Sequence, residues 1–407
     1  MTHPHESHSY GPDTLALHTG IHRSEANEMS EGLFLTQGYA YESAEQAAAA
    51  FAGDIDVYMY SRYANPTVTA FQERMAAIEG APACFATATG MAAVFVSLVS
   101  ILKQGDRLVA GRALFGSTIS VFTNYFENWG ITVDYVDAHD NDDWARALAT
   151  PAKAVYVESP SNPMQDVVDI PAVAALSKAA GALFVVDNVF ATPVGQKPLE
   201  LGADVVVYSA TKHIDGQGRV LGGAILGSEE YINGPVKQMI RQMGATISPF
   251  NAWVLLKSLE TLSVRVKAQS ASAADLAEWL DAHPRVAVAR YPLLPSHPQY
   301  ELAKSQMTLG GTLVTIDVAI PEGTDPAGPE ARAAAFRFMN ALDLFEISNN
   351  LGDAKSISTH PATTTHNKLT PEARAAVGMS EATVRLSIGL EDLADLRADL
   401  ERALASL

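Results

Sequence analysis

Short apolar runs alternate with helix-like stretches through the middle of this 407-residue chain. Four of the runs are expected to be buried strands: Arg107–Ala110, Ala154–Val157, Leu183–Val186 and Val205–Tyr208. Continuously apolar runs of this length are typical of parallel strands that are covered on both faces. Stretches rich in Ala, Leu and Lys lie between them, such as Asp169–Ala180, and favour helices. The alternation predicts an α/β fold with a doubly wound, mainly parallel sheet.

The chain is expected to have three parts. Residues 1–65 contain little that could form a core of their own, so we expect an N-terminal arm that lies on another surface. Residues 66–262 carry the alternation and are expected to form a large domain. Residues 263–407 are expected to form a smaller α+β domain with four elements: a helix near Leu262–Leu280, strands near Gly311–Val318 and Thr383–Ile388, and an amphipathic helix at Leu393–Leu404.

Composition argues against several classes of function. The formal net charge of −18 opposes binding to nucleic acid or to anionic lipid. The apolar stretches are short and carry polar residues, so we expect no membrane span. Cys84 is the single cysteine, which rules out an internal disulfide and suits a cytoplasmic protein. His3, His5 and His8 lie in a tail that is expected to be frayed and is not a preorganised metal site, so no metal is expected.

Lys212 is the leading candidate for a catalytic residue. The apolar strand Ala203–Tyr208 runs directly into Ser209-Ala210-Thr211-Lys212-His213, and open α/β sheets bind ligands at this carboxyl edge. Desolvation there lowers the pKa of a lysine, and the neutral amine is the form that attacks an aldehyde. The hydroxyls of Ser209 and Thr211 are suited to a phosphate. A lone lysine at such a place is more often a surface residue in a polar turn, and only the other motifs change that reading.

Asp187 ends a second buried strand, within Leu183-Phe184-Val185-Val186-Asp187-Asn188. A carboxylate at the end of a buried strand is costly unless it is paired. A protonated pyridine nitrogen would pair it, and the pairing would keep the ring an electron sink. A cap on the following turn is the alternative, and these residues alone leave the two readings even.

Three further motifs are suited to anions. Thr87-Ala88-Thr89-Gly90-Met91 opens an apolar helix expected to continue through Leu102, and its first N–H groups either bind a phosphate or are capped by a threonine. Arg62, in the stretch Tyr60–Thr67, either offers a fork to a phosphate or is a solvated turn residue. Arg385 lies inside an apolar strand and needs an anion, which is either a substrate carboxylate or an internal Asp or Glu.

Together these motifs resemble the Cys/Met metabolism family of pyridoxal-phosphate enzymes, from about Asp13 to the end of the chain. The resemblance implies an aspartate-aminotransferase-like (fold type I) architecture with pyridoxal 5′-phosphate as the cofactor. It also implies a homotetramer, a dimer of dimers whose active sites are shared between subunits, acting on small molecules. Its marks occur in the family's order: Tyr60–Thr67, Glu158-Ser159-Pro160-Ser161-Asn162-Pro163, Asp187-Asn188, Ser209–Lys212 and His360-Pro361-Ala362-Thr363-Thr364-Thr365-His366.

The resemblance also implies a role for each matching residue around the cofactor. Lys212 would hold the cofactor as a Schiff base and later move protons. Asp187 would hold the pyridine nitrogen, and Phe115 would stack on the ring. The residues implied to bind the phosphate are Gly90, Met91, Ser209 and Thr211, joined by Tyr60 and Arg62 from a neighbouring subunit.

On the substrate side, Arg385 is implied to bind the carboxylate of the amino acid. Asn162 would lie near that carboxylate and near the cofactor's phenolic oxygen. The family usually has Tyr where this chain has Phe115, so the acid that helps the leaving group is expected to be Lys212, Tyr60 or water. Asn350 replaces a frequent Ser, which puts the substrate contacts at that position in doubt. Arg219 is a candidate cation for the distal carboxylate of a succinyl ester.

The stretches Leu114–Thr118, Ile214–Arg219 and Asn349–Ser356 are most similar to a branch of the family that uses sulfide. We therefore expect a γ-replacement in which sulfide displaces succinate from O-succinyl-L-homoserine and forms L-homocysteine, a step of methionine biosynthesis. The alternatives are a cystathionine γ-synthase reaction with cysteine, use of the acetyl ester, and an elimination of the methionine γ-lyase type. A non-catalytic binding protein on this scaffold is disfavoured by the joint presence of the lysine, aspartate and arginine described above.

Overall fold

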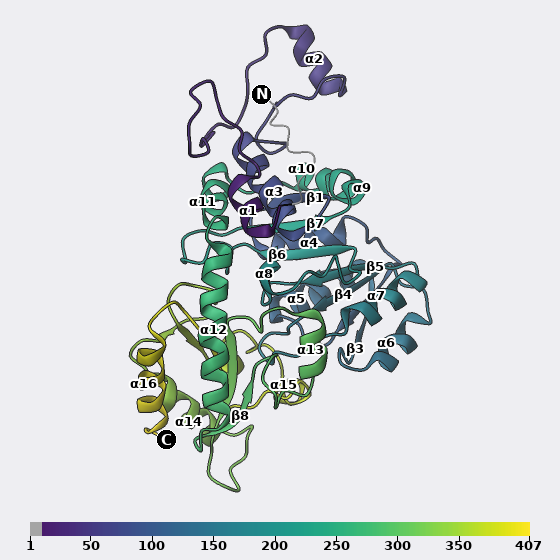
Figure 1. Ribbon diagram of the computed structural model, residues 1–407. Coiled ribbons are helices and arrows are strands. Elements are labelled where there is room, and N and C mark those ends of the chain that lie inside the picture. The colour runs from purple at the N-terminus through teal and green to yellow at the C-terminus, as the bar shows by residue number, and fades with distance from the viewer. Residues whose placement is uncertain (1–9) are drawn as a thin grey trace.

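The structure, a computed structural model, describes residues 10–407, and the three histidines of the N-terminal tail lie outside that range. Over the described residues the fold contains one sheet of seven strands and one of five, with helices packed around both (Figure 1). This arrangement confirms the α/β class. Within the described range, no helix has the length and apolar character that a bilayer-crossing segment needs.

The larger sheet is mainly parallel. Its strand order is β1-β7-β6-β5-β4-β2-β3, and every neighbouring pair from β6 to β3 is parallel. β7 pairs antiparallel with both β1 and β6. The strands are β1 (Ala83–Thr87), β2 (Arg107–Gly111), β3 (Thr132–Val136), β4 (Ala154–Glu158), β5 (Leu183–Asp187), β6 (Val205–Ser209) and β7 (Gly223–Gly227).

Both faces of the larger sheet are covered, which explains the continuous apolar runs. Along β5, Val185 packs into the core on one face, while Phe184 and Val186 pack into the core on the other. The covering helices are α3 (Pro66–Glu79), α4 (Gly90–Val99), α5 (Gly116–Val121), α6 (Asn141–Leu148), α7 (Ile170–Ala179), α8 (Thr192–Gly195), α9 (Glu229–Tyr231), α10 (Lys237–Met243) and α11 (Pro249–Leu259). Three short irregular helices lie at Phe122–Phe126, Glu127–Trp129 and Ile232–Val236.

The long helix α12 (Leu262–Asp281) leads from the larger sheet to the smaller one (Figure 1). The smaller sheet has the order β10-β11-β12-β9-β8 and is antiparallel except for the pair β10 and β11. Its elements are β8 (Val286–Arg290), α13 (Tyr300–Gln306), β9 (Leu313–Val318), α14 (Pro329–Asn340), β10 (Glu346–Ile347), β11 (Ile357–Thr359), a short helix at Pro361–Thr363, α15 (Pro371–Ala375), β12 (Thr383–Ser387) and α16 (Leu393–Leu404).

Residues 20–63, here called the arm, stand away from both sheets and carry α2 (Ala44–Ala52), whereas α1 (Pro12–His18) lies on the body against α3 (Figure 1). Several large apolar side chains of the arm face outward: Met29 is 85% exposed, and Leu35 and Phe51 are each 71% exposed. Glu31 of the arm forms ion pairs with the buried Arg74 of α3 and with Lys257 of α11, and so connects the arm to the body of the protein.

The predicted elements differ from the observed ones mainly at their ends. The helix expected to run from Gly90 through Leu102 ends at Val99, and in the turn that follows the N–H groups of Ile101 and Leu102 both bond to the carbonyl of Leu98. The proposed domain boundaries fall at the starts of α3 and α12, and the division into three domains stays a prediction. The expected C-terminal helix Leu393–Leu404 is observed with the same bounds.

Candidate active site

A cavity of about 450 Å³ opens at the carboxyl edge of the larger sheet, where β4, β5 and β6 end beside the smaller sheet. Most of the candidate residues line it, although they come from distant parts of the chain. Those that line it are Gly90, Met91, Phe115, Asn162, Asp187, Ser209, Thr211, Lys212 and Arg385. Tyr60, Arg62 and Arg219 are not among its lining residues within this chain.

Lys212 follows β6 and extends into the cavity. Its amine donates a hydrogen bond to the side-chain oxygen of Asn350, 138 residues later in the chain. Burial, and then the positive charge of Arg385, lower the pKa of Lys212 to about 8. Near neutral pH, the fraction of Lys212 in the neutral amine form is therefore much larger than for a lysine in water.

Asp187 ends β5 and faces the same cavity. Its carboxylate accepts hydrogen bonds from the hydroxyl of Tyr156 at 3.1 Å and from the N–H of Val189 at 3.1 Å. Burial raises the pKa of Asp187 to about 6, although these bonds oppose the rise. A buried carboxylate of this kind is well suited to a cationic partner.

Glu158, at the end of the neighbouring strand β4, lies directly beside Asp187 in the sheet register. Its carboxylate accepts hydrogen bonds from the backbone N–H of Phe115 at 2.8 Å and from that of Asn162 at 3.0 Å. Burial, and then the charge of Asp187, raise the pKa of Glu158 well above its usual range. One buried carboxyl group therefore fixes the backbone of two residues that line the cavity.

A second side of the cavity is suited to an anion. Thr89 caps α4 by accepting a hydrogen bond from the N–H of Ala92 at 3.0 Å, so the helix starts at the cavity wall. A Cβ added to Gly90 would lie 2.4 Å from the Cβ of Ser209, so glycine is needed for the close approach of this helix to β6. The start of α4 thus lies beside Ser209 at the cavity wall, which Thr211 also lines.

Arg385, on β12, closes the cavity from the smaller sheet and is 1% exposed. Its guanidinium donates to the side-chain oxygen of Asn162 at 2.8 Å and to the carbonyl of Asn350 at 3.0 Å. Among residues 10–407 it forms no ion pair with an Asp or Glu, and its Nε has no hydrogen-bond partner there. Burial lowers the pKa of Arg385 to about 10, so the group remains charged at neutral pH and lacks an anion.

The three remaining candidates lie elsewhere in this chain. Arg62 donates to the carbonyl of Arg241 and lies over the ring of Tyr60 with its guanidinium carbon 5.3 Å from the ring centroid. Arg219 pairs with Asp215 at 3.0 Å and donates to the hydroxyl of Ser258. The role of Arg219 toward a distal carboxylate stays a prediction, and its guanidinium already has internal partners.

The sequence reasoning assigned no role to Tyr156 or Glu158, which bond to Asp187 and to two wall segments. The sequence could have indicated a shared role for them. They are the two polar residues of an otherwise apolar strand, β4, and they lie two positions apart on the same face. Asn350 was placed in a motif, but its contact with Lys212 depends on how the two sheets meet.

Comparison with known proteins agrees with this geometry. The sequence profile described as "Cys/Met metabolism PLP-dependent enzyme" matches residues 13–405. A Mycobacterium tuberculosis protein named O-succinylhomoserine sulfhydrylase is 56% identical over 392 residues, which cover 96% of this chain and 95% of the relative. One of the same name from Pseudomonas aeruginosa is 48% identical over 395 residues, which cover 97% of this chain and 95% of the relative.

A solved structure from Campylobacter jejuni superimposes with a TM-score of 0.91 at 30% sequence identity, covering 97% of this chain and all of that one. It contains N′-pyridoxyl-lysine-5′-monophosphate, in which the cofactor is joined to a lysine side chain. The expected fold type and cofactor are therefore confirmed, and this chain belongs to the Cys/Met metabolism family of pyridoxal-phosphate-dependent enzymes.

Proposed function

We propose that this enzyme replaces the succinyl group of O-succinyl-L-homoserine with sulfide and so forms L-homocysteine for methionine biosynthesis. The observation that carries the proposal is the nearly full-length identity, 56% and 48%, to two O-succinylhomoserine sulfhydrylases. The reaction makes a carbon–sulfur bond, so the enzyme is a transferase. A cytoplasmic location, expected from the single cysteine, belongs to the same proposal.

The residues of the cavity fit pyridoxal 5′-phosphate. A lysine with a lowered pKa and a buried carboxylate line the same cavity, as the aldehyde and the pyridine nitrogen of one ring require. The glycine at the start of α4 lets the first turn of the helix lie close to Ser209, so that both can contact one anion, and Phe115 supplies an aromatic face. In our proposal Lys212 is attached to the cofactor, Asp187 holds its ring nitrogen, and Gly90, Met91, Ser209 and Thr211 hold its phosphate.

Once bound, the cofactor supplies an electron sink for carbanion chemistry at the substrate's α- and β-carbons. Lys212 is proposed to take up and return protons at these carbons, because its amine can exist in both protonation states near neutral pH. Asp187 would keep a positive charge on the ring nitrogen. Glu158 would maintain the relative position of Phe115 and Asn162 through its two backbone hydrogen bonds.

Arg385 is proposed to bind the α-carboxylate of the substrate. It is buried, it is charged, and its Nε lacks a partner among the described residues. The side chain of Asn162 already bonds to it at 2.8 Å and would orient the guanidinium. An arginine fork matches a carboxylate in geometry, so this contact would also fix the α-carbon beside Lys212.

Departure of succinate from the γ-carbon needs little help from an acid, because a carboxylate is a good leaving group. This suits a site that has Phe115 where the family usually has a phenol. Protonation of the departing group would come from Lys212, Tyr60 or water.

The finer assembly is also a proposal: a homotetramer made of two dimers, in which Tyr60 and Arg62 complete the neighbour's phosphate site. It is supported by the outward-facing apolar side chains of the arm and by the distance of both residues from the cavity of their own chain. Apolar patches of this kind are commonly covered by another protein surface.

The proposal is tested by measuring the products from paired substrates. Purified enzyme with pyridoxal 5′-phosphate is supplied with sulfide and either the succinyl or the acetyl ester of homoserine, and a parallel series contains cysteine in place of sulfide. We expect homocysteine to form fastest from the succinyl ester and sulfide. The Lys212→Ala protein provides the uncatalysed background. Preferential formation of cystathionine, preference for the acetyl ester, or 2-oxobutanoate released from methionine as the main activity would contradict the proposal.

A further inference from the structure

The last residue of β5 and the residue after it point to opposite faces of the larger sheet. Asp187 faces the active-site cavity, on the same side as Val185 and Tyr156. Asn188 is fully buried and its side chain lies on the other side, where Tyr208 also packs. Asn188 directly follows Asp187 in the chain, so a displacement of Asn188 also moves the backbone that carries the Asp187 side chain.

A hydrogen-bonded network of fully buried side chains holds Asn188. Its amide nitrogen donates to the hydroxyl of Tyr208 at 2.7 Å, and that hydroxyl donates to a carboxyl oxygen of Glu79 at 2.6 Å. The amide nitrogen of Gln196 donates to the side-chain oxygen of Asn188 at 2.9 Å and to the carbonyl of Ser159 at 3.0 Å. We call Glu79, Tyr208, Asn188 and Gln196 the rear network.

Glu79 is the outer end of the rear network and an unusual group for a protein core. It is the last residue of α3, it is 0% exposed, and one of its carboxyl oxygens has no hydrogen-bond partner among residues 10–407. Burial raises the pKa of Glu79 to about 7, against the lowering effects of the bond from Tyr208 and the charge of Lys197. A core whose only task is packing is more stable with an apolar residue at such a place.

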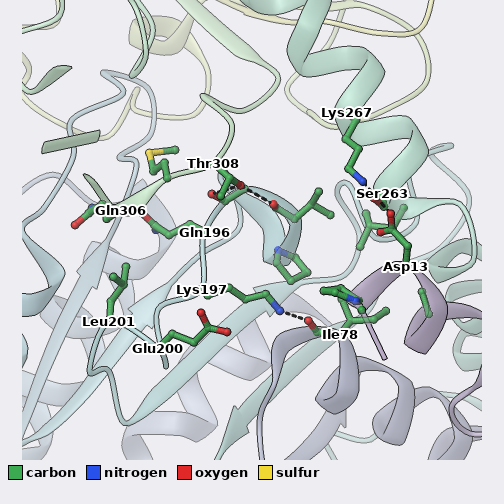
Figure 2. A pocket seen from close by; sticks show the side chains of 18 of the residues that line it. Asp13, Ile78, Gln196, Lys197, Glu200, Leu201, Ser263, Lys267, Gln306 and Thr308 are labelled. Atoms are coloured by element: carbon green, nitrogen blue, oxygen red, sulfur yellow. Dashed lines mark hydrogen bonds and ion pairs between the residues drawn. The ribbon is translucent and has the colours of Figure 1, made fainter. Parts of the chain in front are cut away.

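Beyond Glu79 lies a second cavity of about 630 Å³, lined by α1, α8 and parts of α12 and α13. Figure 2 shows Lys197 reaching across it, with its amine donating to the main-chain carbonyl of Ile78, next to Glu79 in the chain. Gln196 and Gln306 lie together at another part of the wall (Figure 2). The rear network therefore lies behind the sheet, and Gln196 connects the wall of this second cavity with Asn188, the residue next to Asp187.

We infer that Glu79 is a positioning residue, which acts through Tyr208 and Asn188 to aim the Asp187 carboxylate at the cofactor. Glu79 lies on the opposite side of the sheet from the cofactor cavity and does not line it. Its carboxylate accepts from the hydroxyl of Tyr208, which in turn accepts from the Asn188 amide in the shortest of that amide's three hydrogen bonds. The other two go to the main-chain carbonyls of Gln196 at 3.0 Å and Thr192 at 3.3 Å. This inference rests on the proposed contact between Asp187 and the cofactor nitrogen.

The test compares removal of two buried tyrosine hydroxyls in the holoenzyme. Tyr208→Phe removes the hydroxyl that joins Glu79 to Asn188. Tyr231→Phe is the matched control, because the Tyr231 hydroxyl is also buried and donates to a carbonyl, that of Ser97, without contacting the rear network or the active-site cavity. Equilibrium dialysis against decreasing concentrations of pyridoxal 5′-phosphate gives Kd, visible circular dichroism reports cofactor orientation, and urea unfolding reports global stability.

We expect Tyr208→Phe to raise the cofactor Kd about tenfold and to change the visible circular dichroism band, since one net hydrogen bond is at stake. Tyr231→Phe is expected to lower stability to a similar degree with Kd within about twofold of wild type. Glu79→Ala should raise Kd as Tyr208→Phe does, and the double variant should be no worse than either single one. Glu79→Gln retains an acceptor for Tyr208 and should return Kd most of the way to wild type.

Three results would overturn the inference in different ways. If Asp187→Ala leaves the Kd for the cofactor unchanged, the proposed role of Asp187 fails and the inference falls with it. If Asp187→Ala weakens binding but Tyr208→Phe and Glu79→Ala alter only the urea midpoint, the rear network is structural and Glu79 does not position Asp187. Additive effects in the double variant would likewise exclude action through one chain of bonds.

Discussion

The active-site cavity and the arm differ in whether their side chains are buried and bonded within a single chain. In the cavity, Asp187, Glu158 and Arg385 are buried and held by hydrogen bonds from within the same chain. In the arm, Leu35 and Phe51 remain largely exposed. The proposed shared site accounts for this difference: one chain would build the part of the site around the cofactor ring, and the arm would present its side chains to a neighbouring subunit.

The largest expected effect concerns the lysine at the centre of the cavity. Lys212→Ala should lower turnover at least about 10³-fold, because in our proposal Lys212 is both the attachment of the cofactor and the group that moves protons. Borohydride reduction of the wild-type holoenzyme, followed by peptide mapping, should place the cofactor on Lys212. Labelling of another lysine would remove Lys212 from this role.

The next effect concerns Arg385, where the smaller sheet completes the cavity. Arg385→Gln should raise KM for the amino-acid substrate by about 30-fold or more, because loss of a buried charged contact costs about 2–5 kcal/mol. Arg290→Gln is a control, since Arg290 lies on the neighbouring part of the smaller sheet and pairs with Asp317 at 2.8 Å. An unchanged KM in the Arg385 variant would mean that the substrate carboxylate binds elsewhere.

A smaller effect is expected at Phe115. Phe115→Ala should weaken cofactor binding by about tenfold at most, because aromatic contact is worth about 0.5–1.5 kcal/mol beyond burial. Phe115→Tyr keeps the ring and should retain much of the activity. Cofactor titration measures both variants, and an alanine variant with wild-type affinity would exclude stacking.

The carboxyl edge of the larger sheet could be predicted from sequence because local patterns define it. An apolar run predicts a buried strand, and the polar residue at its end predicts a side chain at the carboxyl edge of the sheet. Asp187 follows such a run, and Lys212 lies shortly after another. The antiparallel strand Gly223–Gly227 was not predicted, since a glycine-rich stretch has weak strand propensity and is here stabilised by pairing with β1 and β6.

Contacts between the two sheets were beyond sequence reasoning. Arg385 and Asn162 were expected near the same substrate carboxylate, but their direct bond and the bond from Lys212 to Asn350 depend on how α12 and the smaller sheet dock on the larger one. The contacts of Tyr60 and Arg62 are equally hard to predict from the residues alone, because the phosphate site that we propose for them belongs to another copy of the chain.

The most direct test of the contrast between cavity and arm is complementation between two inactive variants. Lys212→Ala and Arg62→Ala chains, each nearly inactive alone, are coexpressed so that dimers form with both. If Arg62 serves the neighbour's cavity, one site of a mixed dimer carries both defects and the other carries neither. Random pairing makes half of the dimers mixed, so activity should recover to about a quarter of wild type. Verified mixed dimers with no more activity than the two parents would show that Arg62 serves its own chain or acts elsewhere, and would contradict the shared site.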